Sequence, residues 1–205
     1  MSTVESPARG DVSLRDRARE AIRDEVLTRA WLLFAEQGFA ATTVEQIAEV
    51  AGMSRRTFFR YFSGKDELVA ARLLASGDQL AAALAARSDS EPAWPALRAA
   101  FDALVNDVEQ HEDIARPLHV MLQREPEVRA AANERGHRWV ELLEPLIAER
   151  LARTDPGGEI NLRARAVIGS ALACFDAAQL VWTAQPGSRL GPLVDEAMQA
   201  VAPIR

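Results

Sequence analysis

The sequence has little of what enzymes and secreted proteins commonly use: one cysteine, one tyrosine and three histidines in 205 residues. A single thiol, Cys174, cannot form a disulfide within the chain or a cysteine cluster around a metal, and this suits a reducing cytosol. The histidines, His111, His119 and His137, do not stand at metal-ligand spacing. Tyrosine and isoleucine are sparse, whereas alanine, leucine and arginine dominate, which favours helices over strands.

Other signals are also missing. Met1–Gly10 has no apolar core of a signal peptide, and no apolar run reaches membrane-spanning length. No glycine-rich phosphate loop follows a strand, because Asp155–Gly158 follows a helical segment. We therefore expect a cytoplasmic protein that is not an enzyme, with no catalytic residue, metal, cofactor or membrane partner.

Charge is distributed unevenly along the chain. The net charge is −6, but residues 1–68 carry 10 basic and 11 acidic side chains against 14 and 19 in residues 69–205. The segment Ser54–Lys65 holds four basic side chains and no acidic one. A local basic patch on an acidic body is the electrostatic pattern of a nucleic-acid interface.

The apolar periodicity predicts an all-α chain of about nine helices without strands. Residues 1–14 read as a disordered arm, because they mix Ser, Pro, Gly and alternating charges. A first helix is expected over Arg15–Glu36, and a helix from Lys65 towards Ala86. Later helices include a long one to about Arg153, then about Leu162–Ala184 and about Gly191–Ala202.

The segment Thr43–Phe62 predicts a helix-turn-helix. Thr43 and Gln46 form a capping box at the start of the first helix. Gly52 can take the positive φ of a tight turn, and Ser54 can cap the second helix. Phe58 is expected to pack the second helix onto the first, with Phe62 also in the core. Such a unit places its second helix in the DNA major groove.

Residues 30–68, AWLLFAEQGFAATTVEQIAEVAGMSRRTFFRYFSGKDEL, resemble the DNA-binding signature of the TetR family. The resemblance covers roughly residues 15–70. It implies an N-terminal three-helix DNA-binding domain, residues 15–68, that acts as a dimer on a palindromic operator. It also implies a helical effector-binding and dimerisation domain, residues 69–205.

Matching the family motif position by position gives the expected DNA contacts. Arg55, Arg56 and Thr57 stand where bases are read, and arginine can pair with guanine O6 and N7. Thr43, Tyr61 and Lys65 match phosphate contacts. Phe59 replaces a frequent tyrosine and is expected to make apolar contact with a sugar or a thymine methyl. The complete expected interface is Thr43, Ser54, Arg55, Arg56, Thr57, Phe59, Arg60, Tyr61 and Lys65.

The last two helices are expected to dimerise. The segment 162–184 is apolar nearly all round, as in a helix buried on two sides, and the last helix has one apolar face. The expected interface residues are Ala173, Ala177, Leu180, Val181, Leu193, Ala197 and Met198. Ordinary core packing in a monomer is the alternative. Asp176 in this apolar segment is expected to be satisfied structurally, or else to bond across the dimer or to an effector.

The middle helices are expected to hold a large apolar effector pocket, lined by Phe101, His119, Met121, Leu122, Trp139 and Phe175, although each could be simple core. Residues 121–139 also resemble the effector domain of MftR-like regulators, which are associated with acyl-coenzyme A. That resemblance implies phosphate contacts for Arg124, Arg129, Arg135 or Arg138; ordinary surface roles are the alternative.

The leading hypothesis is a repressor released from its operator by a small, largely apolar effector of unknown identity, for which acyl-coenzyme A is one candidate. One alternative is a DNA-binding regulator without a small-molecule effector, switched by a protein partner or not switched. Another is an unrelated helical enzyme that only mimics the motif.

Overall fold

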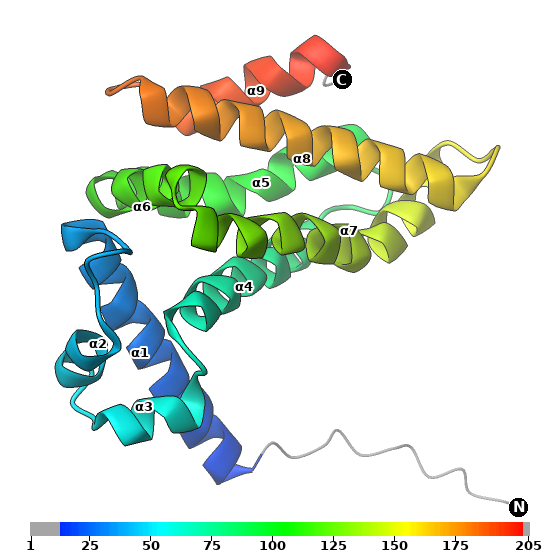
Figure 1. Cartoon of the computed structure of the whole chain (residues 1–205). Coiled ribbons are helices and arrows are strands. Elements are labelled where there is room, and N and C mark those ends of the chain that lie inside the picture. Colours follow the sequence, from blue (N-terminus) through cyan, green and yellow to red (C-terminus); the bar gives the residue numbers. More distant parts are fainter. Residues whose placement is uncertain (1–12, 203–205) are drawn as a thin grey trace, which may run out of the picture.

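The computed structural model describes residues 13–202, without the side chains of residues 126, 127 and 129–133. This range forms nine helices and no strand, as the sequence predicts (Figure 1). The helices are α1 (Leu14–Gln37), α2 (Val44–Val50), α3 (Arg55–Tyr61), α4 (Lys65–Ala85), α5 (Ala93–Gln110), α6 (Glu112–Arg124), α7 (Pro126–Thr154), α8 (Ile160–Ala184) and α9 (Leu190–Val201).

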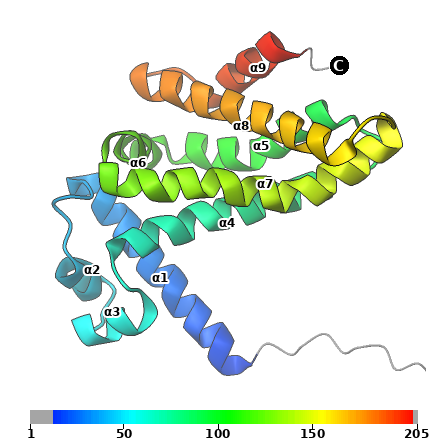
Figure 2. The same cartoon turned by 45° about the vertical axis from the view of Figure 1, so that its right-hand side comes forward.

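Helices α1, α2 and α3 form a small unit at the end of the molecule away from α8 and α9 (Figures 1 and 2). Helix α1 begins at Leu14, one residue earlier than expected, because the hydroxyl of Ser13 accepts from Asp16 N–H and caps it. Residues 1–12 of the expected arm lie outside the described range. The core of the unit contains Phe34, Phe39, Ile47, Phe58 and Phe62, so the two recognition-segment phenylalanines are buried as predicted.

Local sequence signals set the ends of α2 and α3. Thr43 Oγ1 accepts from Gln46 N–H while Gln46 Oε1 accepts from Thr43 N–H, which completes the predicted capping box. Gly52 has φ +67° in the turn, a conformation that costs glycine no steric clash. Ser54 Oγ accepts from Thr57 N–H and caps α3.

The remaining helices build a larger core from α4, α5, α7, α8 and α9. Two of them, α4 and α8, are long and apolar enough to cross a membrane, judged by length and composition alone. By that criterion the sequence-based expectation of no apolar run of membrane-spanning length was wrong. Both helices contribute residues to this core, among them Leu80, Leu84, Ile168 and Phe175. A helix packed on several sides needs the same apolar composition.

One close approach fixes α7 against α4. A Cβ at Gly77 would lie 2.5 Å from Trp139 Cδ1 and 2.6 Å from its Nε1, so only glycine leaves room for the indole. Trp139 is buried and its Nε1–H donates to the carbonyl oxygen of Leu73, 3.1 Å away. The glycine therefore lets an aromatic ring lie directly on the α4 backbone.

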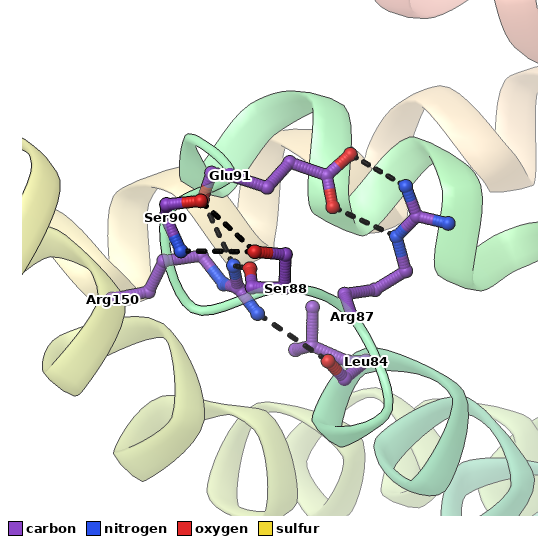
Figure 3. Close-up of polar contacts among 6 residues, drawn as sticks. All are labelled: Leu84, Arg87, Ser88, Ser90, Glu91 and Arg150. Atoms are coloured by element: carbon purple, nitrogen blue, oxygen red, sulfur yellow. Dashed lines mark hydrogen bonds and ion pairs between the residues drawn. The ribbon is translucent and has the colours of Figure 1, made fainter.

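Arg150 of α7 holds the connection between α4 and α5 (Figure 3). The side chain is buried, and its guanidinium donates to the carbonyl oxygens of Leu84, Ser88 and Glu91. Glu91 in turn pairs with Arg87 at 2.7 Å. Burial of a charged side chain is tolerable when carbonyl acceptors replace water, so Arg150 orders a loop that has little apolar material of its own.

The two parts of the fold share α4 and are joined by apolar packing. The expected boundary between residues 68 and 69 falls inside this helix. Leu118 and Met121 of α6 and Val128 of α7 belong to the same buried cluster as Phe34 and Phe58. The small unit is therefore seated on the larger one.

Candidate nucleic-acid interface

The solvent-exposed surface of α3 carries two of the three expected base-reading side chains, Arg55 and Arg56. Arg55, Arg56 and Arg60 are exposed, and Phe59 is 45% exposed, while Phe58 is fully buried. The helix α3 is thus anchored in the core by Phe58 and presents three guanidinium groups and the Phe59 ring to solvent.

Arg55 is partly positioned by its neighbours. Its guanidinium lies 3.1 Å from a Glu45 carboxylate oxygen on α2 and 5.5 Å from the centre of the Phe59 ring. In the described range Arg56 has no such carboxylate partner. The pair at Arg55 is exposed, where ion pairs contribute roughly 0–1 kcal/mol, so DNA can compete for this guanidinium.

The hydroxyl groups at the helix starts have local roles. Thr43 and Ser54 are exposed caps, and Ser54 Oγ lies 2.9 Å from Thr57 Oγ1. Thr57 is half-buried. Thr43 and Ser54 are therefore accessible to a ligand, whereas Thr57 is more enclosed.

Lys65 has a structural role that the sequence did not indicate. Its ammonium donates to the carbonyl oxygens of Phe39 at 2.7 Å and Thr42 at 3.3 Å, and lies 4.2 Å from the centre of the Phe39 ring. An ammonium has three donors, so one remains for a phosphate. Tyr61 is half-buried, and the guanidinium carbon of Arg60 lies 5.1 Å from the centre of the Tyr61 ring.

A clamp between α1 and α4 holds the end of α3, and no local motif pointed to it. The Arg23 guanidinium donates to the Tyr61 carbonyl oxygen and pairs with Glu67 at 3.2 Å. Glu67 also accepts from the Ser63 N–H at 2.7 Å. Burial alone would raise the pKa of Glu67, but these hydrogen bonds and the positive charge of Arg23 outweigh burial and hold that pKa below its ordinary value.

Only some of the six residues expected to line the effector pocket lie around a common cavity. Four of them line a cavity of about 110 Å³ between α1, α4, α5, α6, α7 and α8: His119, Leu122, Trp139 and Phe175. Phe101 does not, because it stacks flat behind Phe175 with ring centres 4.6 Å apart. Met121 also lies away from the cavity, in the core shared with α1. The cavity is small, whereas the sequence suggested a large one.

A second cavity, of about 360 Å³, adjoins the first between α1, α4, α5 and α6. The two share a wall made of Trp31, Arg72, Asp107, Ala115 and Leu118. Sequence reasoning missed this space, because α1 and α6 are far apart in the chain and only tertiary packing brings them together.

Two polar side chains of the smaller cavity, His119 and Arg135, have partners within the protein. His119 Nδ1 lies 2.8 Å from the Ala115 carbonyl oxygen, so it donates, and Nε2 then accepts from the Gln179 amide at 3.0 Å. Burial lowers the pKa of His119, which keeps the ring neutral near pH 7. Arg135 pairs with Asp176 at 2.8 Å, so Asp176 has the structural partner that the sequence analysis favoured.

The other arginines that the MftR resemblance singled out differ in surroundings. Arg138 pairs with Glu141 at 3.2 Å on its own helix, and Arg124 is exposed. The Arg129 side chain lies outside the described set. In residues 13–202, no group of three or more His, Cys, Asp or Glu side chains is placed to hold a metal ion.

The face expected to dimerise is largely open to solvent. Leu180 is 55% exposed, Val181 is 39% exposed, and Ala173 and Ala177 are exposed on the same helix. Leu193 and Ala197 of α9 are half-buried. Met198 is the exception: it is fully buried in the protomer's own core, so it offers no surface to a partner and was wrongly assigned.

Comparison with known proteins identifies two matching segments. Residues 26–71 match the model of bacterial regulatory proteins of the tetR family, and residues 91–204 match that of the MftR C-terminal domain. The second match covers more than half of the chain.

Individual relatives are moderately similar. The chain is 36% identical to the transcriptional regulator TcmR of Streptomyces glaucescens over 54% of this chain and 50% of TcmR. It is 32% identical to the transcriptional repressor AcnR of Corynebacterium diphtheriae over 68% of each chain. The chain thus spans half to about two thirds of these curated relatives.

A solved structure is also similar. The crystal structure of Thermus thermophilus FadR, a TetR family repressor in complex with lauroyl-CoA, is 25% identical with a TM-score of 0.52. The match covers 87% of this chain and 92% of that one.

Proposed function

Because this chain belongs to the TetR family of transcriptional regulators, we propose that it is a dimeric repressor that leaves a palindromic operator when a small, largely apolar effector binds. The observation that carries the DNA-binding part is the exposed guanidinium face of α3, backed by the buried Phe58. The related regulator AcnR is a transcriptional repressor, which supports repression over activation for this protein.

In this proposal some side chains contact bases and others contact the DNA backbone. Arg55 and Arg56 reach base edges at the start of α3, and Phe59 makes apolar contact with a sugar or a thymine methyl. Thr57 belongs with Arg55 and Arg56 to the base-reading positions. Phosphates are held, or the groove is flanked, by Thr43, Ser54, Arg60, Tyr61 and the free donor of Lys65. Base contacts give specificity, whereas phosphate contacts give affinity that falls with salt.

The test begins by sequencing DNA fragments that the purified protein selects, which yields the operator. Arg55→Ala or Arg56→Ala should then cost about 1–3 kcal/mol on the operator and relax specificity at one position. Tyr61→Phe should weaken operator and scrambled duplex alike, and the salt slope should stay the same because the lost hydroxyl is uncharged. Arg153→Ala, on the distant α7, is the control.

If the arginine variants also weaken both duplexes equally, the division of roles is wrong. If the wild-type protein binds no duplex at low salt, the DNA-binding function itself fails.

The dimer is proposed to form through the exposed face of α8, with Leu193 and Ala197 of α9 at its edge. Large apolar side chains such as Leu180 are costly to leave in water. A two-fold arrangement places two α3 helices on one side of the DNA, where successive major grooves lie about 34–36 Å apart. A two-fold dimer therefore matches a palindromic operator.

The effector is proposed to be a long-chain acyl compound, and a coenzyme A thioester is one form of it. The apolar walls at Leu122, Trp139 and Phe175 support an apolar chain. The similarity to FadR, solved with lauroyl-CoA, supports the acyl class. The effector acts by binding one arrangement of the helices more tightly than the DNA-bound one.

The energy required is modest. A tenfold loss of operator affinity needs about 1.4 kcal/mol of preference. Roughly two methylenes buried in only one arrangement, at about 0.8 kcal/mol each, supply that amount. Operator release by acyl-coenzyme A thioesters should therefore strengthen with chain length. If no length causes release or thermal stabilisation, the acyl effector is refuted and a protein-switched regulator is favoured.

A further inference from the structure

The indole N–H of Trp31 on α1 lacks a hydrogen-bond acceptor. Its nitrogen is enclosed and has no partner. Other indoles differ: Trp94 Nε1 donates to the Ala202 carbonyl oxygen at 3.0 Å, and Trp139 Nε1 donates to Leu73 at 3.1 Å. Burying a donor without an acceptor costs folding free energy, so such groups are few in folded proteins.

The side chain that carries this donor belongs to the wall shared by the two cavities. Trp31 lines both the 110 Å³ cavity and the 360 Å³ cavity. The smaller cavity alone is below the roughly 300–1,000 Å³ of ordinary ligand sites, whereas the larger falls within that range. A ligand that uses the smaller cavity must therefore extend past Trp31 into the larger one.

The groups at this junction define the chemistry of the ligand. Arg72 can contribute a second donor, because its guanidinium is half-exposed and its ion pair with Asp107 is long, at 3.5 Å, and screened by solvent. The Asp107 side chain is 53% exposed, so water can solvate its carboxylate when Arg72 turns to a ligand. Two donors beside an apolar channel fit one oxygen acceptor that is attached to an apolar chain. The channel walls include Leu73, Leu104, Leu118, Leu122 and Phe175.

We propose that the effector occupies both cavities and that Trp31 Nε1–H donates to its carbonyl or carboxylate oxygen. This inference rests on the proposed function and adds a residue of the DNA-binding unit to the effector site. Because Trp31 belongs to α1, the ligand contacts α1 and the larger helical body together. Occupancy then favours one position of the DNA-binding unit over another, which is the differential contact that a switch requires.

A first experiment needs no ligand. Trp31→Phe, Trp94→Phe and Trp139→Phe remove the same atoms, but only the last two leave a carbonyl without its donor. Trp31→Phe should therefore lower the thermal unfolding midpoint least of the three. If it lowers the midpoint as much as the two controls, the Trp31 N–H has an acceptor in the free protein and the inference falls.

A second experiment uses dodecanoate and its coenzyme A thioester as probes, with the full-length protein labelled at the indole nitrogens. A probe should move the Trp31 N–H signal, identified by its loss in Trp31→Phe, and leave the Trp94 signal in place. Trp31→Phe should bind the thioester about two- to tenfold more weakly, the effect of one neutral hydrogen bond, and should lose more affinity for the charged dodecanoate, while Trp94→Phe should bind as wild type does. Comparing the two probes tells whether a free carboxylate or a thioester carbonyl is the acceptor.

The outcomes separate the two proposals. If a probe releases the operator equally well from wild type and Trp31→Phe, the repressor function stands and the role of Trp31 is refuted. If neither probe binds, both the acyl effector and this inference are refuted, while operator binding is unaffected.

Discussion

Replacing Gly77 by alanine tests whether the contact between α4 and α7 is as tight as it looks. The new Cβ would lie 2.5 Å from Trp139 Cδ1, and Leu142 Cδ1 would lie 3.3 Å away. The indole cannot simply swing aside, because it is buried and bonded to Leu73. Something in the packed interface must move.

Two opposing contributions set the magnitude. Alanine favours the helix over glycine by about 0.8–1.0 kcal/mol. Overpacking of a filled core costs typically 1–3 kcal/mol, and a lost hydrogen bond to a buried carbonyl costs about 1–3 kcal/mol more. We expect a net destabilisation of about 1–5 kcal/mol, and each kilocalorie lowers the unfolding midpoint by roughly 2–4 °C in a chain of this size.

The matched control is Gly136→Ala in α7, where an added Cβ meets nothing within 4 Å. That variant should gain up to about 1 kcal/mol from helix propensity. Thermal and denaturant unfolding of both variants give the comparison. If Gly77→Ala is as stable as wild type or more so, the close approach of Trp139 is wrong. Because Trp139 also lines the smaller cavity, the same variant should weaken the effector response.

Other predictions concern the dimer, the pH dependence and the buried arginine. Ala177→Arg should bury an unpaired charge in the proposed interface and yield folded monomers by sedimentation, since position 177 is exposed in the protomer; Ala82→Arg, on an exposed part of α4, is the control. An unchanged dimer would place the interface elsewhere. Burial lowers the pKa of His119 below its ordinary 6.5, so the unfolded chain takes up that proton first as pH falls, and stability should decline below about pH 6.5. His119→Gln should reduce this decline between pH 7.5 and 5.5, and equal slopes for the two proteins would contradict the burial argument. Arg150→Ala should cost about 3 kcal/mol or more, since three carbonyl groups lose their buried donor; a loss below about 1 kcal/mol in denaturant unfolding would refute that role.

Features set by neighbouring residues could be predicted from the sequence. The capping box at Thr43, the cap at Ser54 and the turn at Gly52 each depend on a few adjacent residues, and all three form as expected. The buried positions of Phe58 and Phe62 follow from helical periodicity. The expected bounds of the long helices differ from the observed ones by only one or two residues.

Features that join distant segments could not be predicted. Lys65 binds carbonyl oxygens 23 and 26 residues away, and nothing near Lys65 indicates that. Met198 and Leu193 have the same apolar character, yet only the first is fully buried, because α5 and α8 cover one side of α9. The cavity residues show the same limit: Phe101 looks like a lining residue until Phe175 is found stacked in front of it.

The uninterrupted course of α4 has a mechanical consequence. Its first turn is tied by Lys65 to the segment before α2 and by Glu67 to α1, whereas its second half is embedded among α5 and α7. At 1.5 Å per residue its 21 residues form a rod of about 30 Å. Pivoting such a rod by about 5° at its embedded end carries the other end through roughly 3 Å. A rotation of α4 that barely changes the shape of the helical body would thus shift the α3 of each protomer in the proposed dimer by nearly the spacing of one base pair. A response to the proposed effector would therefore require no loosening of the packed core.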